Sequence, residues 1–134
     1  MRRLILSALV IVASALAVDA SQSGDGRKVG TLAAVSGSGV TGKVVLHALQ
    51  GGGTRITVVA EGLQPDVEYV SIYYDNADCT LQPDSQNDVI ARYRGNERGK
   101  ARIVGVSDDD IAAIHSVSVR LGNGLVLQAC ATLP

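Results

Sequence analysis

Short runs of alternating apolar and polar residues, separated by turn residues at regular spacing, constrain the fold of this chain more than any other feature. The runs occupy 28–35, 40–49, 54–61, 67–74, 88–94, 100–106, 116–121 and 125–132. Such alternation predicts half-buried β-strands, and eight short strands at this spacing are typical of a β-sandwich or closed barrel. Asn123-Gly124 between the last two runs is a strong hairpin signal. The sequence therefore predicts an all-β domain.

One segment, 107–115, departs from the strand pattern. Ser107 is followed three residues later by Asp110 and then by helix-forming residues. This spacing predicts a capping box on one short helical turn. A calcium loop is the alternative use of Asp108, Asp109 and Asp110, but such loops place their ligands on alternate residues. A capped, solvated turn is therefore the preferred interpretation.

The N-terminus has the pattern of a secretory signal peptide. Arg2 and Arg3 precede the apolar run 4–18, which is followed by small residues at Ala17 and Ala20. A charged start, an apolar centre and a small-residue cleavage site define such a signal. The run is shorter than the roughly 20 apolar residues that a membrane span needs. We expect cleavage after Ala20, or alternatively after Ala17, and secretion or export to the periplasm.

The domain organisation follows from this boundary: a signal peptide at 1–20, a flexible tail at 21–27 and one β domain at 28–134. Without the leader the chain has 10 basic and 12 acidic residues. This balance implies neither a nucleic acid nor a membrane surface as partner. The chain contains neither Phe nor Trp. We therefore expect a core of aliphatic residues with tyrosines at its margins.

Cys79 and Cys130 are the only cysteines. An even number of cysteines in an exported chain normally pairs, so we predict a disulfide between them. A metal-binding or nucleophilic thiol is the alternative, but no histidine lies close in sequence to either cysteine.

The stretch 68–79 combines three tyrosines with an acidic turn. Alternation places Val70 and Ile72 in the core and predicts that the intervening side chains point outward. Tyrosine is enriched at interfaces, so this strand and the turn after it form a candidate binding surface. Its members are Tyr69, Ser71, Tyr73, Asp75 and Asn76. The alternative is an amphipathic strand whose tyrosines lie flat over their neighbours.

A second candidate surface is basic. The hairpin around GNERG carries five bases: Arg92, Arg94, Arg98, Lys100 and Arg102. Such a cluster on a net-negative domain could bind an anionic glycan, lipid head group or partner. A solvated hairpin face, or charges that prevent edge-to-edge strand pairing, is the alternative.

Four segments resemble the copper/zinc superoxide dismutase family. SGSGVTGKVVLHA is similar to its Gly-rich turn and second strand, and VVAEGLQPDVEYVSIYYDNADC to the strand, Gly-Leu turn and strand that end at its loop cysteine. NERGKARI is similar to its charged hairpin, and QACA to its last strand. The resemblance implies an eight-stranded Greek-key β-barrel and pairs Cys79 with Cys130.

The metal ligands of that family do not carry over. Its outward-pointing His-x-His on the fourth strand falls at Ser71 and Tyr73, and its last copper histidine falls near Arg120. The zinc loop corresponds to 80–87, which contains no histidine. Asp88 matches the zinc aspartate, but one carboxylate does not make a site. Neither Ser nor Tyr replaces the imidazole nitrogen that copper prefers.

Further chemistry is excluded by the residues present. The chain has only His47 and His115, which lie far apart in the sequence and cannot complete a zinc site. Leu127 stands where the family has its substrate-guiding arginine. Ser71 has no evident histidine partner for a catalytic triad. Asp75 and Asp78 could act as a catalytic acid and base, but aspartate is common in turns for backbone reasons, which accounts for both residues.

The sequence thus predicts no catalytic residues, no metal and no cofactor. The expected function is that of an exported, non-catalytic superoxide dismutase-like domain, a structural or binding module. Its partner would be an unidentified protein or glycan, or a second copy in a homodimer. No nucleic acid is expected as a partner. After cleavage of the signal peptide, the chain is not expected to span a membrane. A superoxide dismutase with unrecognised ligands is the alternative. An inhibitor or adhesion domain on the same scaffold is a third interpretation.

Overall fold

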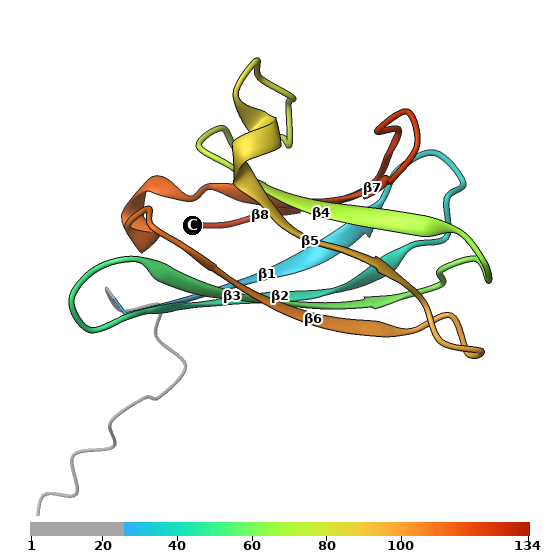
Figure 1. Cartoon of the computed structure of the whole chain (residues 1–134), viewed down its shortest axis with the longest axis horizontal. Helices are drawn as coiled ribbons and strands as arrows, with labels where there is room; N and C mark the ends of the chain where they lie inside the picture. The colour runs from blue at the N-terminus through green and yellow to red at the C-terminus, as the bar shows by residue number, and fades with distance from the viewer. Residues whose placement is uncertain (1–25) are drawn as a thin grey trace, which may run out of the picture.

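The computed structural model describes residues 26–134, which form a nearly closed β-barrel (Figure 1). Eight antiparallel strands lie in the order β5-β4-β7-β8-β1-β2-β3-β6. Their bounds are β1 Arg27–Ala34, β2 Thr41–Ala48, β3 Thr54–Glu61, β4 Glu68–Tyr74, β5 Val89–Arg94, β6 Ala101–Ser107, β7 Ser116–Leu121 and β8 Leu127–Thr132. The predicted eight-stranded barrel is confirmed. The expected signal peptide and most of the tail lie outside the described residues.

Figure 1 shows two layers, with β1, β2, β3 and β6 in one and β4, β5, β7 and β8 in the other. β1 links them, because its first part pairs with β2 and its end pairs with β8. Within residues 26–134 no backbone ladder joins β5 to β6, the two edges of the sheet. Side chains close this seam: a Cβ added to Gly105 would lie 2.6 Å from Ile90 Cγ2. No helix in this part of the chain is long and apolar enough to span a bilayer.

The barrel interior is filled by aliphatic side chains from both layers. On β3 the predicted core face is confirmed, since Ile56, Val58 and Ala60 are buried while Arg55 and Glu61 are exposed. Leucine and valine side chains of the other strands complete this core, among them Leu32, Val44, Leu46, Val117 and Val119.

The Gly-Leu turn closes one end of the barrel. Gly62 has a φ of 75°, and a Cβ there would lie 2.1 Å from the carbonyl oxygen of Gly39. Glycine is therefore required both for the left-handed backbone and for the close approach. The turn directs Leu63 into the core, where it is buried, and the Leu63 amide donates a 3.0 Å hydrogen bond to the carbonyl of Gly99.

The prediction for the faces of β4 is wrong. Tyr69 and Ser71 are 1% and 0% exposed and lie inside the barrel, whereas Val70 and Ile72 lie on its outer face. Both faces are buried, because the segments 75–88 and 122–126 cover the outer one. Apolar alternation identifies the core face only when the opposite face meets water. In a barrel without Phe or Trp, tyrosines supply the large interior side chains.

The helical turn after β6 exists but lacks the predicted capping box. A 3₁₀ turn, η2 (Ile111–Ala113), begins after Asp110, which makes no side-chain capping bond. Ser107 ends β6 instead, and its hydroxyl accepts a 2.9 Å hydrogen bond from the Asp109 amide. A second 3₁₀ turn that the sequence did not predict, η1 (Ser85–Asp88), lies in the segment before β5.

Candidate functional site

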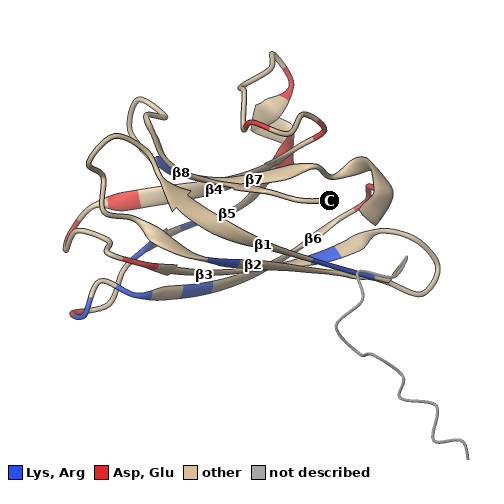
Figure 2. Ribbon diagram, turned by 180° about the vertical axis from the view of Figure 1, so that it is seen from behind, with Lys and Arg blue, Asp and Glu red and all other residues tan. Residues whose placement is uncertain are grey.

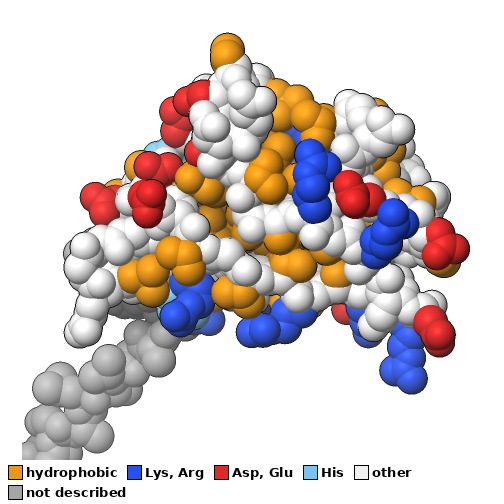
Figure 3. Space-filling view, in the orientation of Figure 1, with side chains coloured by type: hydrophobic (Ala, Val, Ile, Leu, Met, Phe, Trp, Pro, Cys, Tyr) orange, Lys and Arg blue, Asp and Glu red, His pale blue; other side chains and the backbone are white. Residues whose placement is uncertain are grey.

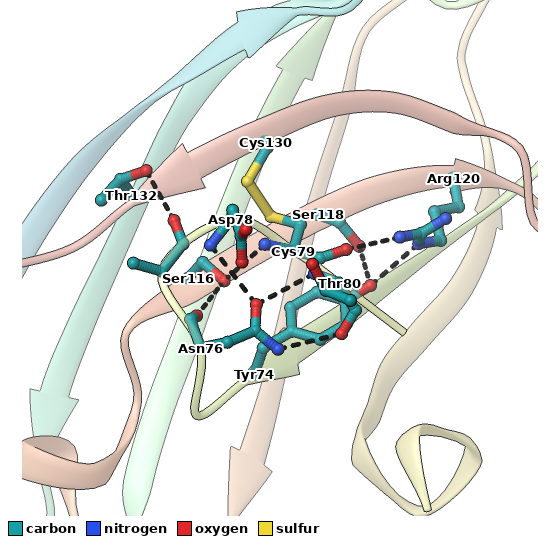
Figure 4. Close-up of a disulfide and its surroundings, with 11 residues drawn as sticks. Tyr74, Asn76, Asp78, Cys79, Thr80, Ser116, Ser118, Arg120, Cys130 and Thr132 are labelled. Atoms are coloured by element: carbon teal, nitrogen blue, oxygen red, sulfur yellow. Dashed lines mark hydrogen bonds between the residues drawn. A yellow bond between two sulfur atoms is a disulfide. The ribbon is translucent and has the colours of Figure 1, made fainter. Parts of the chain in front are cut away.

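The outer face of β4 and β7 carries a buried arginine. Arg120 is 7% exposed and points away from the barrel interior, under the loops that cover this face. Its Nε donates to the Tyr74 hydroxyl at 2.9 Å and its Nη2 to the carbonyl of Cys79 at 2.5 Å (Figure 4). Its Nη1 donates to the carbonyl of Leu125 at 2.7 Å. Two neutral carbonyls and a hydroxyl thus take the place of a carboxylate partner.

Two serines of β7 extend this network. The hydroxyls of Ser118 and Tyr74 are 2.7 Å apart. Ser116 accepts a hydrogen bond of 3.1 Å from the Cys79 amide and donates one of 2.6 Å to the carbonyl of Asn76. The network therefore attaches the loop after β4 to the sheet at several points.

The predicted disulfide is present. Cys79 and Cys130 are bonded with a Cα–Cα distance of 6.0 Å, which joins the loop after β4 to β8 (Figure 4). The Asn76 side chain orders the same loop, since its amide group donates to the Thr80 carbonyl and its oxygen accepts from the Thr80 amide, both at 2.9 Å. Asn76, predicted as part of a binding surface, is thus engaged within the loop.

A pocket of about 470 Å³ lies beside this network on the outer face. Five apolar residues line it: Ile72, Leu81, Pro83, Val89 and Leu125. Gln82, Ser85, Gln86 and Arg92 add polar groups. In Figure 3, hydrophobic side chains gather between the loop that contains η1 and the loop before β8, with basic side chains beside them. Sequence reasoning missed this pocket, because its lining comes from β4, two loops and β5.

A second pocket, of about 330 Å³, is acidic. Asp75, Asp84, Asp88 and Asp109 line it together with Tyr73. Burial raises the pKa of Asp88 above its usual value, and the neighbouring carboxylates of Asp109, Asp84 and Asp75 raise it further. Burial also raises the pKa of Tyr73 to about 12. Asp75, Asp84 and Asp88 belong to the segment 75–88, and Asp109 follows β6, so their approach depends on the folded loop and could not be predicted from a local motif.

The predicted tyrosine surface does not assemble as one surface. Ser71 lies inside the barrel, where its hydroxyl is 2.8 Å from that of Tyr93. Tyr69 stacks on Tyr93 at a ring-centroid distance of 6.3 Å, and its hydroxyl accepts a 2.8 Å hydrogen bond from the Gln64 amide. Of the five predicted residues only Asp75 is largely exposed, and Tyr73 is partly buried at the acidic pocket.

The five bases of the predicted basic hairpin also do not form one surface. Arg92 pairs with Glu68 at 3.3 Å, and Lys100 pairs with Glu61 at 3.7 Å. Arg94 donates to the Asp66 carbonyl at 2.6 Å. The remaining two bases lie apart, Arg98 at the exposed tip and Arg102 on the outer face of the other layer. The five bases therefore do not form one anion-binding cluster.

Comparison with solved structures places this barrel among superoxide dismutase-like folds. A copper(II) form of Candida albicans superoxide dismutase 5 matches with a TM-score of 0.52 and 13% identity, over 81% of this chain and 91% of that chain. Two single-residue variants of the same enzyme match equally, with a TM-score of 0.52, at 13% and 12% identity. They cover 81% and 84% of this chain and 90% of theirs. No family model and no curated protein sequence matches.

The residues on the outer face do not fit the copper that this fold carries in the enzyme family. Ser71 and Tyr73, which the sequence comparison aligned with the outward histidines, point to the interior. The outer face of β4 instead presents Val70, Ile72 and Tyr74. Arg120, near which the resemblance puts the last copper histidine of the family, has no lone pair to donate and carries a positive charge that repels a cation.

Other groups that could bind a metal are dispersed. His47 is exposed on β2, and His115 lies half-buried directly before β7. Asp88 stands with other aspartates, but among residues 26–134 no group of three or more His, Cys, Asp or Glu side chains is arranged to hold a metal ion.

Proposed function

We propose that this chain is an exported, non-catalytic superoxide dismutase-like domain that acts as a binding module. One observation carries the proposal: the guanidinium of Arg120 is buried on the outer face with three engaged donors, near the position that the resemblance assigns to the last copper histidine. The disulfide and the signal-peptide pattern at 1–20 support export, because disulfides persist in oxidising compartments.

The binding site of the module is the apolar pocket on the same face. Its volume of about 470 Å³ lies within the range of small-molecule sites, which are mostly apolar with a few polar groups. The lining residues have this composition. We infer that the ligand is a small apolar molecule whose polar end contacts Gln82, Gln86 or Arg92.

A fluorescent apolar anion, anilinonaphthalene sulfonate, tests the pocket. Leu81 is 39% exposed at its rim, so Leu81→Asp should abolish saturable binding of the probe without loss of the fold. Val126, 55% exposed and outside the pocket lining, offers a matched control: Val126→Asp should bind as the parent does. Equal binding by the Leu81 variant, or no saturable binding by the parent, would exclude this pocket.

A further inference from the structure

The outer face of the layer β1-β2-β3-β6 has a continuous row of mostly apolar side chains. The register pairs Val29 with Val45, Val45 with Thr57, and Thr57 with Val104, so these four residues cross all four strands side by side. Val29 and Val104 are 41% and 45% exposed. No described segment covers this valine row, in contrast to the outer face of β4.

Basic residues flank the valine row on both sides. Lys43 and Arg102 lie in the neighbouring row on one side, joined through Val59. Arg27 and Arg55 lie in the row on the other side, with His47 between them. All of these bases are exposed. We call the three rows together the basic face, whose bases are Arg27, Lys43, His47, Arg55 and Arg102.

The five bases of the basic face form no ion pair among the described residues; Glu61, on the same surface at the end of β3, pairs with Lys100. Within residues 26–134 the only ion pairs are Arg92–Glu68 and Lys100–Glu61, so Lys43, Arg55 and Arg102 take part in none. The aspartates gather elsewhere, at the pocket lined by Asp84 and Asp88. Figure 2 shows several Lys and Arg along the strands of one layer, where one acidic position marks the end of β3, and acidic positions on β4 and on the loops beyond the other layer. Most bases of the outer face of β1-β2-β3-β6 are thus separated from the aspartate cluster, although the net charge of the chain is only −1.

We propose that the basic face binds the surface of an anionic lipid bilayer. The bases would contact phosphate head groups, and the valine row would lie between them against the acyl boundary, as in other interfacial surfaces. The acidic loops would point away from the bilayer, which fixes the orientation of the domain. The nearly balanced net charge of the sequence predicted no binding to a membrane surface. A net charge does not show that the basic and acidic residues lie on different surfaces of the fold.

The shape of the face favours a bilayer over other anionic partners. A protein partner normally places aromatic or arginine anchors in pockets. The described pockets are lined by none of the residues of the basic face, and the face contains no aromatic side chain. An anionic polysaccharide would bind the bases but leave the valines in water. A lipid surface can contact the bases and the valine row together, and it requires no pocket of complementary shape.

Vesicle co-sedimentation tests the proposal. The chain beginning at Ser21 is suitable, because all eight strands lie within 27–132 and the apolar leader would itself bind lipid. Phosphatidylglycerol vesicles should retain it at low salt and release it as salt rises, whereas phosphatidylcholine vesicles should not bind it. The triple variant Lys43→Gln/Arg55→Gln/Arg102→Gln should bind about a hundredfold more weakly, at about 1 kcal/mol per base.

A matched variant tests whether vesicle binding depends on where the bases lie or only on the total positive charge of the domain. Arg94→Gln/Arg98→Gln/Lys100→Gln removes the same charge from outside the basic face and from outside the apolar pocket, and should change vesicle binding only a few-fold. An equal loss in both variants would overturn the proposal, as would retention on heparin or polyglutamate without retention on phosphatidylglycerol vesicles. Val29→Ser/Val104→Ser, at the two exposed members of the valine row, should weaken vesicle binding but leave any heparin binding unchanged. Unfolding in urea should establish that every variant is folded.

Discussion

Arg120 Nε donates a 2.9 Å hydrogen bond to the hydroxyl of Tyr74, and the guanidinium carbon lies 5.9 Å from the centroid of the same ring. The pair joins β7 to β4 on the outer face of the barrel. Because Arg120 also donates to the carbonyls of Leu125 and Cys79, it connects the sheet to both covering loops. A charged side chain thus performs the structural role that an apolar residue usually has in a core.

Replacing this arginine should destabilise the fold. Arg120→Met leaves the carbonyls of Cys79 and Leu125 without their donors, so we expect the free energy of unfolding to fall by about 3 kcal/mol. Urea denaturation followed by circular dichroism measures the change. Arg94→Met, which removes one bond of an exposed arginine, should stay within about 0.5 kcal/mol of the parent. Equal stability of the two variants would contradict a structural role for the network.

Removing the disulfide should also destabilise the domain. Cys79 and Cys130 are 51 residues apart, and the chain-entropy model gives about 4 kcal/mol for a loop of this length. Cys79→Ser/Cys130→Ser should lower the urea midpoint accordingly. Intact mass after alkylation without reductant should show no modified thiols in the exported parent protein, and two alkylated cysteines there would refute the pairing in the natural compartment.

The inverted faces of β4 can be tested at Ser71. Inside the barrel, Ser71→Ala leaves the Tyr93 hydroxyl without its partner and should cost about 1–3 kcal/mol. Adding Tyr93→Phe removes the unpaired hydroxyl, so the double variant should be less unstable than the sum of the single ones. On an outward-facing strand Ser71→Ala would be neutral, and that result would restore the assignment from the sequence.

Tyrosine ionisation should weaken the fold at high pH. Burial raises the pKa of Tyr93 to about 12, from the ordinary pKa of 10.0 that a tyrosine has in the unfolded chain. A raised folded-state pKa contributes stability that is complete below pH 10 and is lost as pH rises toward 12. Urea midpoints should therefore fall over this interval, together with the appearance of tyrosinate absorbance. A Tyr93→Phe variant should show a shallower decline; an unchanged slope would assign the loss to other groups.

Metal analysis separates the proposed module from the alternative enzyme. Protein refolded with excess copper and zinc should lose both on dialysis against a mild chelator and should not dismutate superoxide, because the outer face offers Tyr74, Ser118 and Arg120 in place of imidazoles. Near-stoichiometric copper that survives dialysis, with activity lost on stronger chelation, would establish a superoxide dismutase with unrecognised ligands.

The strands were predictable because local signals determine them. Turn residues such as Gly51-Gly52-Gly53 and Gly122-Asn123-Gly124 mark each boundary, and alternation marks each one-sided strand such as β3. The faces of β4 were not predictable, because the loop that covers Val70 and Ile72 is specified by tertiary contacts. The family resemblance singled out Arg120, but not its role in holding the two covering loops. That role depends on backbone carbonyls of the loops, and because every residue type has a backbone carbonyl, no sequence pattern indicates them.

The sites were less predictable than the strands, for a related reason. Each pocket and the basic face combine residues from segments far apart in the chain, so no local motif represents them. The valine row required the register of four strands, in which a shift of one residue would turn every side chain to the other face.

The seam between β5 and β6 gives the barrel a line along which it can open. Side-chain packing such as that of Ile90 over Gly105 closes this line, while every other strand boundary has a backbone ladder. Separation along the seam therefore breaks no ladder, so amide protons of β5 and β6 should exchange with solvent through small openings. Those of β1, β2, β7 and β8, enclosed between two paired neighbours, should exchange only when the whole domain unfolds. The seam between β5 and β6 is therefore the line along which the barrel deforms most easily.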